Sequence, residues 1–258
     1  MKQLLWMIAV MGCSNDTREA VPDPVPPANE NLIADPIVEK AIRLSLKKPE
    51  GDLTRTDLEK VTRLNLYDTK ITGDGLKEVT KLQKLKHLNL SRTSAGLREI
   101  AKMQQLTSLN LYDTKITGEG LKEVAKLEKL QYLTLGRTKI TDKGLKDLAK
   151  LQKLEQLSLY RTQITDVGLK EVAKLQKLKR LDLTGSQITD AGLKEVAKLK
   201  KLESINFSYT KTKVTDAGLK EMAKLQKLKW LNLGGAKVTD AGVAELKKAL
   251  PNCTILGP

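Results

Sequence analysis

The side chains on which many enzymes and small extracellular domains depend are scarce in this chain of 258 residues. It contains two cysteines and one histidine, and aromatic residues make up 3% of it. Two cysteines exclude a disulfide-rich scaffold. The single histidine, His87, is too little for a multi-histidine metal site, and it gives no basis for a Ser-His-Asp triad. We interpret His87 as a surface residue. We therefore expect no metal, no cofactor and no enzymatic activity.

Long apolar runs are also missing. The run Leu4 to Met11 has eight apolar residues, too few to span a bilayer but suited to the core of a signal peptide. It ends in Val10-Met11-Gly12-Cys13, which resembles the lipobox of bacterial lipoproteins. The resemblance implies a signal peptide over residues 1–12, cleavage before Cys13 and lipidation of Cys13. The alternative is an ordinary signal peptide with an incidental cysteine, and hence a secreted protein.

Residues 13–31 carry four prolines and no apolar periodicity. This composition is typical of an extended tether. A lipid at Cys13 would anchor the tether in a bacterial membrane, and Ser14 after the cysteine favours the outer membrane or cell surface over the inner membrane. The sequence therefore predicts an extracytoplasmic protein. Cys253 then has no cysteine to pair with, and we interpret it as a buried residue near the C-terminus.

A repeat of about 24 residues runs from Val61 to the C-terminus, with the rule L-x-x-L-x-L-x-x-T-x-I-T-[DG]-x-G-L-K-E-V-A-K-L-x-K. Its eight copies begin at Val61, Leu85, Leu106, Leu130, Leu154, Leu178, Leu202 and Leu228. The second copy is three residues short, and the seventh carries two extra residues. A fixed period of this length indicates a solenoid, in which stacked repeats share one core.

Each repeat predicts a short strand and then a helix. In the fifth copy, the alternation of Leu157 and Leu159 predicts a strand with one buried face. Thr165-Asp166 is interpreted as the N-cap of the helix, and Leu169 and the apolar residues after it as its inward stripe. The aspartates that recur at this place once per repeat are interpreted as structural caps.

The pattern resembles the leucine-rich repeat family, in the subtype with "ITDxGLxxLAxL" after the strand, over residues 53–257. The resemblance implies an α/β fold, a right-handed curved solenoid of about eight repeats with parallel strands on the concave side and helices on the convex side. We expect an N-terminal helical cap over 32–60, repeats over 61–250 and a C-terminal cap over 251–258. Many family members have asparagine at one position of the repeat, where it bonds backbone groups between coils. These repeats have mostly threonine there, and we expect a ladder of hydroxyls to satisfy buried backbone groups instead.

The two end caps have their own signals. Asp35-Pro36 predicts the N-cap and first residue of a helix that runs to about Leu46. The segment from Leu250 to Ile255 predicts a short closing strand. Both would cover an open end of the repeat stack.

The helix half of the repeat hardly varies, whereas the outward positions around the strand vary freely. Every tyrosine, and the one tryptophan outside the predicted signal peptide, falls at these variable positions. Tyrosine, tryptophan and arginine are enriched at binding hot spots. The predicted ligand-binding residues of the concave face are Tyr112, Tyr132, Arg137, Tyr160, Arg161, Arg180 and Trp230.

A structural explanation competes with binding. Aromatic residues favour strands in any case. The series Asp68, Arg92, Asp113 and Arg137 alternates in sign at one repeat position, which predicts a cross-strand ladder of ion pairs. In that interpretation Arg161 is the first arginine of the series without an acidic neighbour, and Arg161 and Arg180 become the better candidates.

The formal net charge is +15. Lysine recurs on the helix of nearly every repeat, and we interpret it as a solvated convex surface with some pairing to Glu171 and its equivalents. The alternative is association of this Lys-rich face with anionic glycan or lipid. A signal peptide argues against nucleic acid as a partner.

The sequence therefore predicts a non-enzymatic binding scaffold, a cell-envelope leucine-rich-repeat lipoprotein that recognises a protein or peptide on its concave face. Similar repeats occur in eukaryotic substrate receptors of ubiquitin ligases, which carry an F-box before the repeats. Residues 14–52 show no F-box pattern, which disfavours that alternative.

Overall fold

The computed structural model describes residues 32–94, 96–209 and 214–257. The predicted signal peptide, the lipidation site Cys13 and the tether over 13–31 lie outside the described residues. The chain divides into the units Met1–Asn31 and Leu32–Pro258, and the second unit contains all the repeats.

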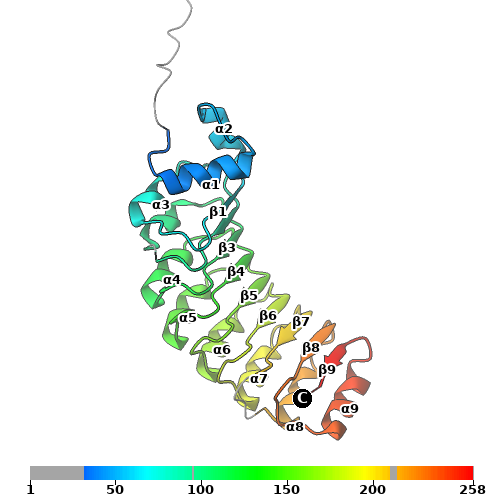
Figure 1. Ribbon diagram of the computed structural model, residues 1–258. Helices are drawn as coiled ribbons and strands as arrows, with labels where there is room; N and C mark the ends of the chain where they lie inside the picture. The colour runs from blue at the N-terminus through cyan, green and yellow to red at the C-terminus, as the bar shows by residue number, and fades with distance from the viewer. Residues whose placement is uncertain (1–31, 95, 210–213, 258) are drawn as a thin grey trace, which may run out of the picture. The chain divides into compact units, whose positions relative to one another are not determined.

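Nine strands of three residues each form one parallel sheet in chain order (Figure 1). They are β1 (Arg63–Asn65), β2 (His87–Asn89), β3 (Ser108–Asn110), β4 (Tyr132–Thr134), β5 (Gln156–Ser158), β6 (Arg180–Asp182), β7 (Ser204–Asn206), β8 (Trp230–Asn232) and β9 (Thr254–Leu256). The middle residue of each strand from β1 to β8 is buried and its neighbours face outward, as the alternation predicted. The repeats together form an open, curved α/β solenoid, so the predicted fold class is confirmed.

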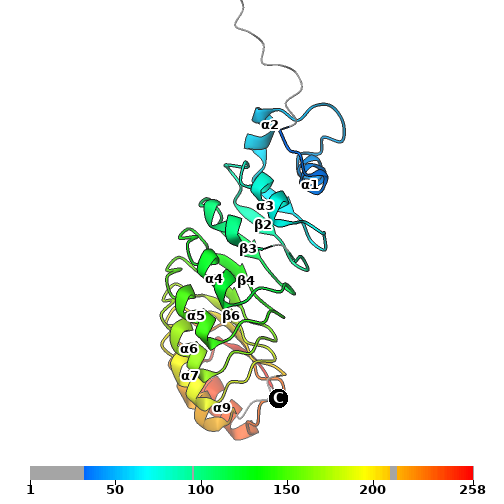
Figure 2. The ribbon, with the colours of Figure 1, turned by 90° about the vertical axis from the view of Figure 1, so that its left-hand side faces the viewer.

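The helices lie on the side of the coils opposite the strands (Figures 1 and 2). They are α3 (Gly73–Val79), η1 (Arg98–Lys102), α4 (Gly118–Val124), α5 (Asp142–Leu148), α6 (Asp166–Val172), α7 (Asp190–Val196), α8 (Asp216–Met222) and α9 (Asp240–Ala249). The short second repeat has a 3₁₀ helix, η1, in place of an α-helix. Its deletion removes the threonine that precedes the other helices, and η1 has no side-chain cap.

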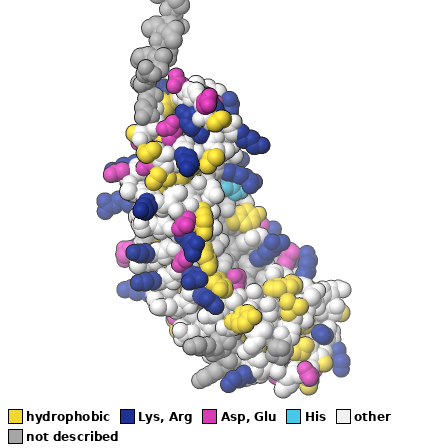
Figure 3. All heavy atoms as spheres, in the orientation of Figure 1, with side chains coloured by type: hydrophobic (Ala, Val, Ile, Leu, Met, Phe, Trp, Pro, Cys, Tyr) yellow, Lys and Arg dark blue, Asp and Glu magenta, His cyan; other side chains and the backbone are white. Residues whose placement is uncertain are grey.

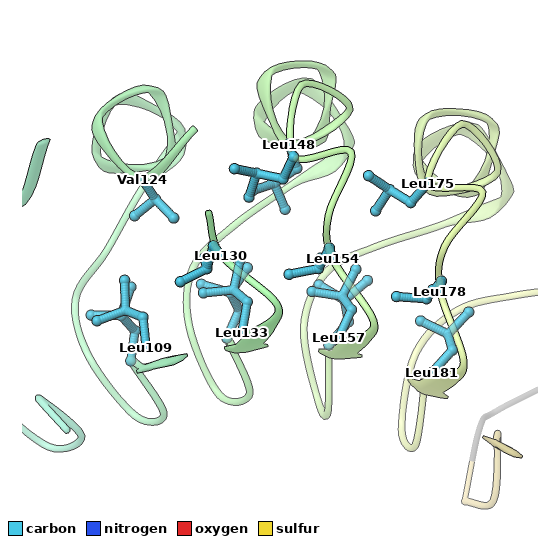
Figure 4. Packing of buried hydrophobic residues seen from close by; sticks show 14 of the residues in the cluster. Leu109, Val124, Leu130, Leu133, Leu148, Leu154, Leu157, Leu175, Leu178 and Leu181 are labelled. Atoms are coloured by element: carbon cyan, nitrogen blue, oxygen red, sulfur yellow. The ribbon is translucent and has the colours of Figure 1, made fainter. Parts of the chain in front are cut away.

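Leucines shared between neighbouring coils fill the space between strands and helices. Leu133, Leu157 and Leu181 lie in one row along the sheet, and Leu148 and Leu175 face them from the helix side (Figure 4). Each of these five side chains is at most 2% exposed. A single coil cannot bury such a row alone, so the core forms only when the coils stack.

The first helix begins where the sequence predicted. In α1 (Pro36–Leu46), the Asp35 carboxylate accepts hydrogen bonds from the backbone N–H groups of Ile37 and Val38 at 2.8 and 3.0 Å. The buried face of α1 packs on the first coil, and Ser45 Oγ donates to the Arg63 carbonyl. A second short helix, α2 (Arg55–Lys60), follows with a capping box. At the other end β9 pairs with β8, as predicted for a closing strand.

The threonine hydroxyls of the repeats bond to backbone carbonyls. Thr93, Thr138 and Thr162 each donate to the carbonyl three residues earlier in the same coil, at 2.8, 2.6 and 2.7 Å. The turn after the strand brings that carbonyl back to the hydroxyl. The prediction that these hydroxyls satisfy backbone groups is therefore confirmed, with each of these bonds made within one coil.

Aspartates at the start of the helices provide the inter-coil contact instead. The Asp142 carboxylate accepts from Thr165 N at 2.9 Å and from Thr165 Oγ1 at 2.6 Å, where Thr165 is the N-cap residue of the next helix. The same pair of bonds joins three further aspartates to the next threonine. We call these contacts the Asp–Thr clasps, and they are Asp142/Thr165, Asp166/Thr189, Asp190/Thr215 and Asp216/Thr239. Each of these carboxylates thus links two coils and does not act as a cap of its own helix.

Candidate functional site

Three of the seven predicted binding residues share one hollow on the strand face. Tyr132, Arg180 and Trp230 are the first residues of β4, β6 and β8, and the register of the parallel sheet places them in one row. They line a hollow of about 300 Å³ together with the outward residues of the strands between them. Gln156 and Ser204 come from β5 and β7 and are shorter. We call this site the β4–β8 hollow.

The other four predicted residues lie elsewhere. Tyr112, Arg137, Tyr160 and Arg161 follow the ends of β3, β4 and β5, in the turns that lead away from the strands. None of the four lines the β4–β8 hollow. Because the first residue of a strand and the turn lie several residues apart along an extended chain, the predicted set divides into two separate surfaces.

The turn surface is held by its own ladder, as the structural alternative proposed. Arg92 Nε lies 3.5 Å from one oxygen of Asp113, and Arg137 Nε lies 3.9 Å from the other. Arg92 Nη1 also donates to the Tyr67 hydroxyl at 2.9 Å, which raises the pKa of Arg92. Hydrogen bonding to Tyr112 raises the pKa of Arg137 in the same way. Arg92 and Arg137 therefore bind acidic and tyrosine side chains of the same chain.

Tyr112 and Tyr160 meet across a glycine. Their ring centroids are 6.2 Å apart, although their strands are separated by β4. A Cβ at Gly136 would lie 3.0 Å from the Tyr112 ring and 3.1 Å from Tyr160 Cβ, so the absent side chain makes this contact possible. Arg161 lies over the Tyr160 ring at 5.3 Å, a cation–π distance. Within the described ranges, Arg161 has no acidic partner, as the alternating series predicted.

The backbone of the turn surface has a feature that the sequence interpretation missed. The ladder residues occupy the left-handed region, with φ of 54° at Asp68, 57° at Arg92 and 48° at Arg161. Arginine is uncommon there, because its Cβ crowds the backbone. Gly185 and Gly235 occupy the same repeat position with φ of 72° and 82°. Those two glycines were the available sequence signal for this turn.

Asparagines that end the strands were also missed. The side-chain oxygens of Asn65, Asn110 and Asn206 each accept from the backbone N–H two residues later, at 3.0 to 3.1 Å. These bonds close the turn after each strand. The outward position that ends the strand is thus structural in these coils, which leaves the first strand position to vary.

Arg180 is the free cation of the β4–β8 hollow. Its side chain is exposed, and it makes no ion pair and no side-chain hydrogen bond among the residues that the structure describes. The nearest acidic groups have other partners. Glu203 lies 2.9 Å from Lys229, and this contact lowers the pKa of Glu203, to which Arg180 adds a smaller electrostatic effect.

Asp182, two residues after Arg180 on β6, also lines the hollow, and both of its oxygens accept hydrogen bonds from neighbouring side chains or backbone. One oxygen accepts from Thr184 N at 3.0 Å and from Thr184 Oγ1 at 2.6 Å. The other accepts from Ser158 Oγ at 3.1 Å. Arg180 therefore presents its donors to the hollow without an acceptor from the described residues.

His87 lines a second hollow, of about 610 Å³, between α1 and the first strands. Burial and the neighbouring Arg63 lower the pKa of His87. Cys253 is a buried free thiol, as predicted, and burial raises its pKa. In the described part of the chain, no group of three His, Cys, Asp or Glu residues has the geometry of a metal site. No described helix is both long and apolar enough to span a bilayer.

The convex face carries lysines and acidic residues side by side (Figure 3). Lys174 lies 2.7 Å from Glu171, and Lys198 lies 2.6 Å from Glu195, so the predicted pairing is confirmed. A second set of exposed lysines has no ion pair within the described ranges. That set occupies one repeat position on four consecutive helices, and its members are Lys146, Lys170, Lys194 and Lys220.

Comparison with known proteins agrees with this architecture. The chain resembles internalin C2 of Listeria monocytogenes, at 25% identity and a TM-score of 0.66, over 87% of this chain and 94% of that one. It also resembles the internalin inlF of the same organism, at 22% identity and a TM-score of 0.57, over 88% and 76% of the two chains. A search of curated proteins gave no match. The family model of the leucine-rich repeat region matches residues 57–241, and the chain therefore belongs to the leucine-rich repeat family.

Proposed function

We propose that this chain is a non-enzymatic binding scaffold of the bacterial cell envelope, which recognises a protein or peptide on its concave strand face. The observation that carries the proposal is the β4–β8 hollow. There a row of strand residues presents two aromatic side chains and one arginine that makes no ion pair with any residue the structure describes. Aromatic and arginine side chains supply most of the binding energy at protein interfaces. The similarity of the fold to bacterial internalins supports a protein-binding role.

The location follows from the N-terminus. Cleavage before Cys13 and acylation of that cysteine would tether the repeats to the outside of a membrane through residues 13–31. Metabolic labelling with an alkynyl fatty acid tests this step. We expect the parent chain to be labelled and to fractionate with membranes, and Cys13→Ser to lose both properties. Unlabelled parent chain in the medium would instead establish an ordinary secreted protein.

The recognition surface is tested by affinity capture from envelope extract at physiological salt. The bait is the full chain, compared with a hollow variant (Tyr132→Ala/Arg180→Ala/Trp230→Ala) and a turn variant (Tyr112→Ala/Tyr160→Ala/Arg161→Ala). We expect a partner that the parent and the turn variant retain and the hollow variant loses. Equal recovery by all three would place recognition outside the strand face.

A second candidate function rests on the unpaired lysines of the convex face. Four consecutive helices repeat one exposed lysine, which favours salt-sensitive attraction to anionic glycan or lipid headgroups. The capture experiment separates the two functions. Binding through the convex face would survive in the hollow variant, fall with added salt, and disappear when Lys146, Lys170, Lys194 and Lys220 are changed to glutamine.

A further inference from the structure

Large side chains occupy alternate strands in the β4–β8 hollow. Tyr132, Arg180 and Trp230 come from β4, β6 and β8, with Gln156 and Ser204 between them. The row therefore has the order aromatic, short, cation, short, aromatic. The pattern is specific to this part of the sheet, because the first residues of β1 to β3 are Arg63, His87 and Ser108.

This spacing selects a backbone conformation in a ligand. Neighbouring strands lie about 4.8 Å apart, so each aromatic residue is about 9.6 Å from the central arginine along the row. A polyproline II helix has three residues per turn and rises about 3.1 Å per residue, so it presents the same face every ~9.3 Å. An extended strand repeats its face every ~6.7 Å. An α-helix presents the same face about every seven residues, which is about 10.5 Å. Compared with the spacing of about 9.6 Å in the row, this leaves a mismatch of nearly 2 Å between the first and the last of the three residues.

The central position selects a negative charge. The guanidinium of Arg180 has no acceptor in the described protein, while the neighbouring ion pairs are closed. Lys179 lies 2.8 Å from Glu155, and Lys229 lies 2.9 Å from Glu203. A free guanidinium binds a carboxylate through two parallel hydrogen bonds.

The two flanking positions select apolar groups. Tyr132 is 36% exposed and Trp230 is half-buried, so both aromatic side chains are accessible at the two ends of the row. Aromatic surfaces are the usual docking sites of proline-rich segments, whose polyproline II conformation costs little entropy to bind.

We propose that the β4–β8 hollow binds a segment of a partner protein in the polyproline II conformation, in which Asp or Glu is flanked three residues before and after by an apolar residue. The carboxylate pairs with Arg180, and the apolar residues lie on Tyr132 and Trp230. The segment crosses the strands along the row. This inference rests on the proposed recognition by the concave face and names the ligand of that face.

Isothermal titration calorimetry of the full chain tests the inference with three synthetic nonapeptides. The matched peptide is acetyl-Pro-Leu-Pro-Pro-Glu-Pro-Pro-Leu-Pro-amide. The register peptide, acetyl-Pro-Pro-Leu-Pro-Glu-Pro-Leu-Pro-Pro-amide, has the same composition with leucine two residues from the glutamate. The third peptide replaces the glutamate of the matched peptide with glutamine. We expect the matched peptide to bind about tenfold more tightly than either of the others, as loss of a hydrogen-bonded charge or of a fitted apolar contact predicts.

The protein variants identify the contacts. Arg180→Ala should weaken binding of the matched peptide about tenfold and leave the glutamine peptide unaffected, so that the two changes are not additive. Arg63→Ala is the matched control, because Arg63 holds the same repeat position on β1, outside the hollow. Circular dichroism should show all variants folded. Equal binding of the three peptides, or equal loss from Arg180→Ala and Arg63→Ala, would overturn the inference.

The failure of this inference can be told from the failure of the proposed function. A captured protein that requires Tyr132 and Trp230 but not Arg180 would leave concave recognition standing and refute the acidic ligand. Binding of a neutral oligosaccharide to the two aromatic residues, with no binding of the matched peptide, would refute the peptide class.

Discussion

Neighbouring coils are joined by different polar contacts in the early and the late part of the solenoid. From the second to the fourth coil, exposed side chains of the turns form the ladder of Arg92, Asp113 and Arg137. From the fourth coil onward, the Asp–Thr clasps join the starts of the helices. The corresponding positions in the first and third coils are Gly73 and Gly118, which have no carboxylate to offer.

The turns of the late coils differ from those that carry the ladder. In the coils that the clasps join, the turn position of the ladder becomes Gly185, Tyr209 and Gly235, and Arg161 has no acidic partner among the described residues. The β4–β8 hollow lies over the same coils. On the strand side of the late coils, the ion pairs Lys179/Glu155 and Lys229/Glu203 still join neighbouring coils. Arg180 lies between these pairs and makes no ion pair among the described residues, and this is where we place binding.

The largest effect is expected from removing a clasp. Asp190→Ala leaves Thr215 N and Oγ1 without the acceptor that they contact at 2.8 and 2.7 Å. Loss of two hydrogen bonds to a charged group should lower the free energy of unfolding by about 2 kcal/mol. Urea unfolding followed by circular dichroism measures it. The control is Asp240→Ala in the last coil, where no further coil follows, and an equal loss in both variants would contradict the role of the clasps.

A smaller effect is expected from crowding a clasp. A Cβ at Gly218 would lie 2.4 Å from Asp190 Oδ1 and 2.9 Å from Leu193 Cδ1. Gly218→Ala should displace the carboxylate and lower the free energy of unfolding by about 1.5 kcal/mol, despite the better helix propensity of alanine. Gly73→Ala is the control from the early part, because a Cβ there meets nothing within 4 Å. It should be neutral or stabilising in the same unfolding experiment.

Acid should weaken both parts through different carboxylates. Hydrogen bonds from Lys48 and Thr54 hold the pKa of Asp57 well below its ordinary value, and hydrogen bonds from Thr239 lower the pKa of Asp216. A carboxyl group with a lowered folded pKa stabilises the fold above its unfolded pKa and loses that contribution as pH falls through the folded pKa. Stability should therefore decrease below about pH 4.

Amide hydrogen exchange at pH 5 and pH 3 can assign this loss to a region. Asp57→Asn should reduce the acid sensitivity of α1 and α2, and Asp216→Asn that of α8 and α9. A change that spreads evenly over all coils in either variant would show that the two parts unfold as one unit.

The smallest effect is expected from the exposed ladder. Arg92→Ala removes an ion pair whose side chains are 49% and 33% exposed. Solvent screening limits such pairs to less than about 0.5 kcal/mol. Thermal unfolding at low and at high salt should show a small difference that disappears with salt. A loss as large as that of Asp190→Ala would reverse the comparison between the two parts.

The strands and helices could be predicted because each depends on residues close together in the chain. The alternation of Leu157 and Leu159 set the buried face of β5, and Asp35-Pro36 marked the start of α1. The candidate site was predicted in part. Tyr132, Arg180 and Trp230 share a hollow because one repeat position recurs on parallel strands in register.

The division of the predicted site into two surfaces follows from spacing within the repeat, because Tyr132, Arg180 and Trp230 begin strands and the other four residues follow strands. The left-handed backbone at Arg161 was harder to foresee, because arginine is uncommon in that region. Tyr112 and Tyr160 lie in the third and fifth coils, and their rings approach each other across the fourth. This contact depends on Gly136 of the fourth coil, which has no side chain to separate them.

The sequence by itself determined the repeat, the alternation that buries the leucines and the family to which the chain belongs, because these depend on a short period that every coil repeats. Only the tertiary structure decided which polar groups meet. Asp142 accepts hydrogen bonds from Thr165, and Arg180 is left without an acceptor in the part of the chain that the structure describes. Such contacts join residues about one repeat apart, and their distances are set by how closely the coils pack around the shared core.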